Sequence, residues 1–236
     1  MASECREILV RADHRGLICD ASSMQSIYWF GFTEGPYRHR PPAVGAFCCQ
    51  GAGFGLDRKT ERMAVAVHEA GHALAAFTLG VHVPAVSIRE QEGILPCGHP
   101  YDVTGELDEV RLAGATVKQG MTVLVSGERA EDRWLRENGL WTEQRAFFTE
   151  RGALGDRATA RTILSREFGV PLRFGTSAPG AEDTADWWRY HPISDELLTD
   201  VWPQVMLLAE RVADAGALSG DAAAEVCGLT NPTRPY

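Results

Sequence analysis

A continuous helical pattern begins at Asp57 and is the clearest periodic signal in the chain. Asp57 or Thr60 can cap this helix, because short polar side chains accept hydrogen bonds from the first free amides. No Gly or Pro interrupts the pattern before the segment HEAGH. Gly80, with Pro84 just beyond it, predicts the end of the helix.

A short β element is expected after this helix. Residues 83–90 alternate and are rich in β-branched side chains, which predicts a strand. Residues 91–106 contain Gly and Pro and indicate a loop, with a second short strand around Ile94.

Most of the remaining chain has apolar residues at helical spacing. Pro203 lies inside the longest of these segments and should kink or split it. Two segments give no regular pattern: residues 138–153, and 172–192, where Trp187 and Trp188 are expected to anchor a loop. Helices are predicted within 107–137, from about Gly155 to before Pro171, over 194–215 and over 219–227.

Two regions of the chain differ in character. Residues 1–56 hold frequent Gly and Pro, as in FTEGPYRHRPPAVGAFCCQGAGFG, and form an irregular N-terminal extension of unknown function. Residues 57–230 form one domain. The expected fold is mainly α with a minor β part, in which a small β element lies beside the HEAGH helix.

Composition narrows the class of protein. The chain has 236 residues, 44% of them hydrophobic, and a formal net charge of −9. An acidic chain is a poor nucleic-acid binder, because phosphate contacts need a basic face. No run of 18 apolar residues predicts a membrane span, and the N-terminus lacks the apolar core of a secretory signal. A cytoplasmic protein with reduced cysteines is therefore expected.

The segment VAVHEAGHALA carries the clearest chemical signal. His68 and His72 are four residues apart, so on a helix their imidazoles share a face and can bind one metal ion. Glu69 lies beside them and can take a proton from a water that zinc activates. This HExxH spacing predicts a zinc hydrolase site. The alternative is an amphipathic helix whose two histidines have no joint role.

A catalytic zinc needs a third protein ligand and an open fourth position. Spacing alone does not choose the third ligand. The extended pattern HExxHxxGxxH is absent, since Ala75 and Thr78 occupy its later positions. The open candidates are His82, His99, Asp102, Glu106, Glu131, Asp132 and Asp156.

The order of motifs resembles the peptidase domain of the FtsH-type AAA+ metalloproteases. VAVHEAGHALAAFTLG is similar to that family's HEAGHALV helix, and GALGDRATARTIL to its GASNDxxxATxIA segment. Weaker similarities are VPAVSIREQEGILPCG to the following strand, LVSGERAEDRWL to the LxGGRAAEExxF helix, and LLAERVADAGALSGDAAAEV to the closing helices. The resemblance covers roughly residues 60–227.

The resemblance implies a ligand set. In that family the aspartate of GASNDxxxAT is the third zinc ligand, and Asp156 stands at the matching position. His68, His72 and Asp156 would then hold Zn²⁺, with Glu69 as the general base. Glu131 matches the acidic pair of the GGRAAEE helix and could hold a histidine by a hydrogen bond. Without a zinc role, Asp156 would be a helix N-terminal acid stabilised by the helix dipole.

The chain also departs from the family. It has no GxxxxGK[ST] phosphate loop and no membrane anchor, so the ATPase module that unfolds and threads substrates is missing. The connection from Glu131 to Asp156 is longer, WTEQRAFFTERG has no counterpart, and Ser126-Gly127 replaces the glycine pair. Any ATP-driven unfolding would need a separate ATPase partner.

The sequence therefore predicts a zinc metalloendopeptidase that hydrolyses peptide bonds in unfolded or flexible polypeptide, without nucleic-acid or membrane partners. The strand at 83–90 could receive an extended substrate by edge pairing. Two alternatives remain. One is a catalytically silent module that uses the FtsH-like peptidase fold for binding or regulation. The other is a zinc hydrolase acting on a substrate other than a peptide.

Overall fold

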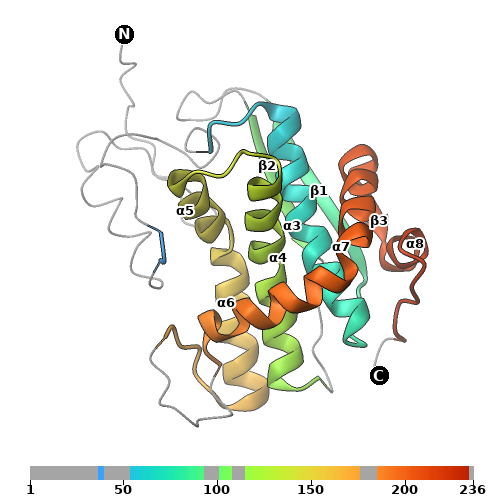
Figure 1. The fold of residues 1–236 in the computed structure, drawn as a ribbon. Helices are drawn as coiled ribbons and strands as arrows, with labels where there is room; N and C mark the ends of the chain where they lie inside the picture. The colour runs from blue at the N-terminus through green and yellow to red at the C-terminus, as the bar shows by residue number, and fades with distance from the viewer. Residues whose placement is uncertain (1–36, 40–53, 93–100, 108–114, 176–184, 234–236) are drawn as a thin grey trace.

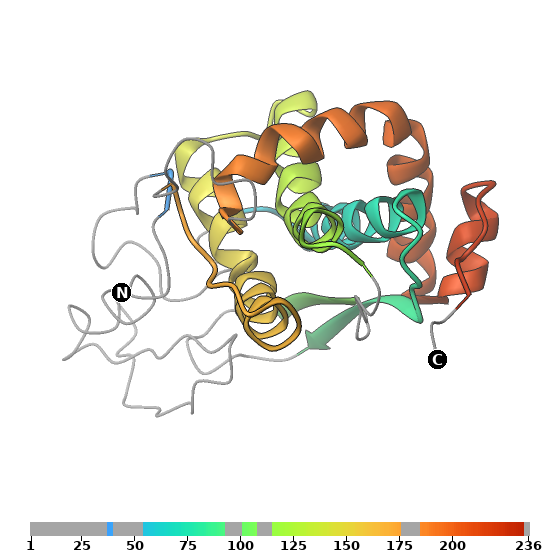
Figure 2. The same cartoon turned by 90° about the horizontal axis from the view of Figure 1, so that it is seen from below.

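The computed structural model describes residues 37–39, 54–92, 101–107, 115–175 and 185–233. Within them the chain is mainly helical with one small antiparallel sheet, which confirms the expected fold class at that level. Helix α3 (Arg58–Thr78) is central and packs against α4 (Val117–Glu137), α7 (Tyr190–Ala215) and the sheet. Figures 1 and 2 show the sheet and α7 on different sides of α3.

Helix α3 begins and ends where the sequence predicts. The Asp57 side chain accepts a 3.0 Å hydrogen bond from the Thr60 amide, and Gly80 adopts a left-handed φ of +74° just after the helix. Every residue from Ala66 to Phe77 is buried. Small side chains permit this close packing, since a Cβ at Gly71 would lie only 2.6 Å from the carbonyl oxygen of Ser126 on α4.

The sheet has the order β2-β1-β3, with both pairings antiparallel. Strand β1 (Ala85–Glu92) confirms the predicted strand, but β2 (Tyr101–Leu107) falls where a loop was predicted. Charged and glycine positions weaken its alternation, and pairing with β1 stabilises it instead. The short strand predicted around Ile94 lies outside the described residues.

Strand β1 is central, not an edge strand. β2 pairs along Val86–Glu92 on one side, and the three-residue strand β3 (Ala217–Ser219), which was not predicted, pairs with Ala85–Ser87 on the other. The edge predicted at residues 83–90 is therefore covered by β3 only along Ala85–Ser87, and from Arg89 to Glu92 no strand of the described residues pairs with that side of β1. In the part of the sheet that the structure describes, β2 is the outer strand on one side and the short β3 on the other.

Helices α4, α5 and α6 follow β2 in the chain. Helix α4 begins with a capping box between Thr116 and Gln119. Helix α5 (Glu143–Gly152) was not predicted, because its apolar residues are consecutive and give no helical period. Helix α6 (Leu154–Ile163) confirms the predicted helix and continues into a π-helical turn, η1 (Leu164–Phe168).

Helix α7 remains a single helix despite Pro203 in its interior. Figures 1 and 2 show it bending part-way along, as expected where a proline removes one backbone hydrogen bond. The 3₁₀ turn η2 (Trp187–Arg189) precedes it, with Trp187 fully buried as an anchor. Helix α8 (Gly220–Val226) is the predicted short C-terminal helix. No helix in the described ranges is long and apolar enough to cross a membrane.

Candidate metal centre

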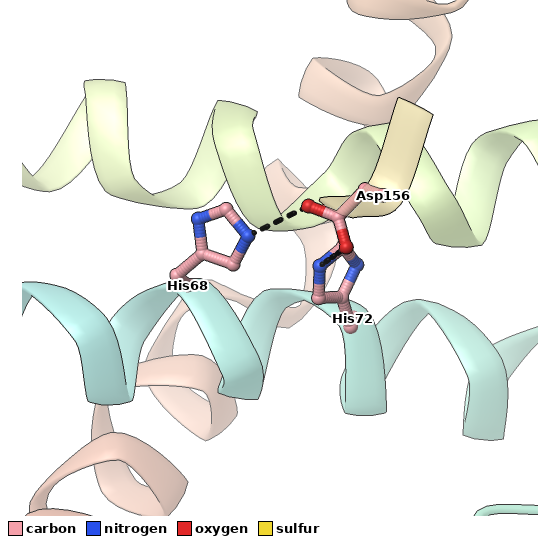
Figure 3. A group of neighbouring side chains, drawn as sticks. All are labelled: His68, His72 and Asp156. Carbon is pink, nitrogen blue, oxygen red and sulfur yellow. Dashed lines mark hydrogen bonds and ion pairs between the residues drawn. The ribbon is translucent and has the colours of Figure 1, made fainter. Parts of the chain in front are cut away.

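Three side chains from two helices converge beside the centre of α3. His68 and His72 come from α3, and Asp156 comes from the first turn of α6 (Figure 3). Nε2 of His68 lies 3.1 Å from Oδ2 of Asp156, and Nε2 of His72 lies 3.4 Å from Oδ1. Asp156 is more than 80 positions from either histidine in the chain, and the three residues form a group that could hold a metal ion.

The outer nitrogens of both histidines are fixed by α4. Nδ1 of His68 lies 2.9 Å from Oε2 of Glu131, and Nδ1 of His72 lies 2.8 Å from the carbonyl oxygen of Val123. Thr149 donates to the other Glu131 oxygen at 3.2 Å. Such partners set the tautomer and ring orientation of a metal-binding histidine, with Nε2 facing inward. The predicted hydrogen bond between Glu131 and a histidine is present. Nothing in the sequence predicts the contact of His72 with the carbonyl oxygen of Val123.

Gly127 on α4 leaves the space between the two imidazoles open. A Cβ at this position would lie 2.3 Å from Nε2 of His72 and 2.6 Å from Nε2 of His68. Any other residue would therefore press its Cβ against both imidazoles. Of the pair Ser126-Gly127, the glycine is the residue that this packing requires.

The centre is rich in negative charge. Both ring nitrogens of His68 face carboxylates, which only accept hydrogen bonds when ionised. Burial alone would lower the pKa of His68, but the hydrogen bonds to Asp156 and Glu131 hold it well above 6.5. Burial likewise opposes the ionised form of Asp156, yet the two histidines hold the pKa of its carboxyl far below the usual range. The surroundings therefore favour a positive charge between these groups.

Glu69 lies between the histidines in sequence and is buried. Its carboxylate rests against β2, because a Cβ at Gly105 would lie 2.0 Å from Oε1 of Glu69. The candidate general base therefore sits next to an outer strand of the sheet. Sequence analysis did not identify Gly105, because the contact joins residues that are far apart in the chain.

The other candidate third ligands have different surroundings. His82 contacts the Pro232 carbonyl oxygen at 2.7 Å, and Glu106 pairs with Arg89 at 2.7 Å. Asp132 accepts hydrogen bonds from Arg136 and Trp141. His99 lies outside the described residues, and Asp102 is described only as a position of β2.

Comparison with known proteins adds no family assignment: no family model matches the sequence, and no curated protein does either.

Proposed function

We propose that this protein is a zincin-like, zinc-dependent metalloendopeptidase related to the FtsH-type peptidase domain. The observation that carries the proposal is the convergence of His68, His72 and Asp156 beside the buried carboxylate of Glu69. Two imidazole nitrogens and one carboxylate are a common donor set for catalytic zinc.

The residues present fit a zinc ion. Ligand atoms about 2.0–2.1 Å from a tetrahedral zinc are roughly 3.3 Å apart. Nε2 of His68 lies 3.1 Å from one carboxylate oxygen of Asp156 and Nε2 of His72 lies 3.4 Å from the other, and one ligand atom from each of the three residues lies within 4.8 Å of the other two. Nε2 of His72 is buried and lies 3.4 Å from Oδ1 of Asp156, so this nitrogen and the carboxylate face each other as two ligands of one cation would. Gly127 keeps the same space clear.

A bound zinc would polarise the scissile carbonyl and lower the pKa of water to about 7. Glu69 would take a proton from the attacking water onto its carboxylate and deliver it to the leaving amine. Glu131 and the Val123 carbonyl would keep both imidazoles in the required tautomer.

Strand β2 is the part of the sheet best suited to receive substrate. Its outer edge has no strand partner among the described residues, and Gly105 places it against Glu69. Backbone pairing on a sheet edge binds extended polypeptide with little sequence preference. We therefore propose unfolded or flexible polypeptide as the substrate class, with folded substrates requiring a separate ATPase partner.

The test compares wild type, Glu69→Gln and Glu137→Gln, each loaded with zinc, on an unfolded protein substrate. Glu69→Gln should retain zinc and lose cleavage by about 10²-fold or more, because it removes the general base. Glu137→Gln, which changes an exposed carboxylate paired with Arg133, should behave like wild type.

Full cleavage by Glu69→Gln would sink the peptidase proposal. A wild type that binds zinc but cleaves neither unfolded proteins nor peptides would instead favour the catalytically silent binding module.

A further inference from the structure

Helix α6, which carries Asp156, has a small contact with the rest of the molecule. Only Arg157 and Ala160 of its ten residues are buried. No side chain caps its N-terminus. The position of Asp156 therefore depends on few contacts, and the residue directly after it provides the largest buried side chain of the helix.

Arg157 is only 1% exposed. Its guanidinium lies 5.4–5.5 Å from the ring centres of Tyr37, Phe174 and Trp187. Nη2 donates to Oε2 of Glu128 at 3.1 Å, whereas Nε and Nη1 have no hydrogen-bond acceptor in the described ranges. Three aromatic rings thus surround a buried cation, where cation–π attraction is strongest.

Glu128 is held just as firmly on α4. Trp187 Nε1 donates to its Oε2 at 3.0 Å, and Nε2 of His191 lies 3.3 Å from Oε1. Glu128 directly follows Gly127, the residue that backs the two imidazoles. Gly127 of α4 and Asp156 of α6 therefore both lie against the two histidines, and the residue that follows each of them, Glu128 and Arg157, forms an ion pair between the same two helices.

We propose that Arg157 is a positioning residue that fixes the first turn of α6, so that Asp156 reaches the metal held by His68 and His72. The inference rests on the proposed zinc site. A buried ion pair adds little net stability compared with apolar residues of similar shape. What the Glu128–Arg157 pair adds is a fixed position for α6.

The N-terminal extension takes part in this arrangement through Tyr37, one of the three rings around Arg157. The next residue, Arg38, donates its amide to both carboxylate oxygens of Glu150 on α5, at 3.2 and 2.9 Å. His39 contacts the same carboxylate at 2.9 Å. The described part of the extension is thus docked beside the helix that carries the third ligand.

The test uses a neutral-pair variant, Glu128→Gln with Arg157→Met, so that no unpaired charge is left in the interior. Zinc dissociation constants are measured by competition with a chromophoric chelator for wild type, Asp156→Ala, the neutral-pair variant and the variant that combines all three substitutions. Amide hydrogen exchange of the metal-free proteins is followed over residues 154–163 and over α3. Arg145→Met, which removes an arginine bonded to the carbonyls of Phe54, Gly55 and Leu140, is the matched control.

The neutral-pair variant should weaken zinc binding by about 10- to 100-fold, the range found when groups that orient metal ligands are removed. It should have almost no further effect once Asp156 is Ala, because both changes remove the same ligand contact. Exchange should accelerate over 154–163 and stay unchanged over α3. Arg145→Met should bind zinc as wild type does.

Wild-type affinity in the neutral-pair variant would overturn the inference, as would losses that multiply in the combined variant or an equal loss in Arg145→Met. If the wild type binds no zinc, the proposed function fails. Hydrogen exchange then decides the positioning role alone, and unchanged exchange over 154–163 would refute it.

Discussion

Helices α3 and α6 both supply ligands to the candidate centre, but they are held in different ways. Every residue of α3 from Ala66 to Phe77 is buried, whereas α6 buries only Arg157 and Ala160. His68 and His72 are therefore fixed by the core itself and by acceptors on α4. Asp156 directly precedes Arg157, whose side chain contacts Glu128 and three aromatic rings. Two of the candidate ligands thus lie on a helix of the hydrophobic core, whereas the third lies on a helix with few buried residues.

The largest effect is expected from closing the space between the two fixed ligands. In Gly127→Ala, the new Cβ would meet Nε2 of both histidines at 2.3 and 2.6 Å. Zinc binding should be lost, while helix α4 should form normally because Ala favours helix more than Gly does. Elemental analysis and circular dichroism measure the two outcomes.

Gly155→Ala is the matched control for that variant, because a Cβ there has no neighbour within 4 Å. It should keep its zinc. A Gly127→Ala protein with wild-type zinc content would show that the imidazoles do not share a ligand across this space.

The second-largest effect is expected from a change beside Glu69 of α3, which should alter catalysis without altering metal binding. In Gly105→Ala, the new Cβ would lie 2.0 Å from Oε1 of Glu69, so the carboxylate must move. We expect zinc content to stay at the wild-type level and kcat to fall by about 10²-fold or more, as for loss of a general base. Steady-state kinetics on an unfolded substrate measure this. An unchanged kcat would mean that Glu69 does not act from the position observed.

The smallest effect is expected at His191 of α7, which lies beside Glu128, the partner of Arg157 on α6. It concerns the pH dependence of the free energy of unfolding. Burial lowers the pKa of His191 to about 4, with Arg129 and Arg38 adding to the shift and Glu128 and Asp195 opposing it. In the unfolded chain the same group takes up a proton below about pH 6.5. Its contribution to stability is therefore complete above pH 6.5 and is lost as the pH falls toward 4, by up to about 3 kcal/mol.

Denaturant unfolding of wild type and His191→Gln at several pH values between 4 and 7 measures this contribution. The difference between the two free energies of unfolding should change over that interval. A difference that stays constant with pH would show that His191 does not titrate as its burial implies.

The bounds of α3 and the placing of its two histidines on one face could be predicted almost completely from the sequence. The spacing of His68 and His72, the Asp57 cap and the Gly80 stop are all local signals, and the structure follows them. These features lie within one helix, where periodicity and capping rules apply directly.

The place of Asp156 in the centre, and the contacts that surround it, could be predicted only in part. Asp156 was assigned by resemblance, because no spacing rule connects it to the histidines. The pairing of Glu128 with Arg157 and the contact of Gly105 with Glu69 join distant segments, so no local pattern reveals them. Strand β2 and helix α5 were missed because neither has a clear period in its own sequence.

The most direct test of the account is the zinc content per chain of wild type and Asp156→Ala, purified side by side and measured by elemental analysis. The account predicts about one zinc in the wild type and much less in the variant, because three ligands hold the ion. Full zinc in Asp156→Ala would contradict the assigned third ligand. No zinc in either protein would contradict the metal centre itself.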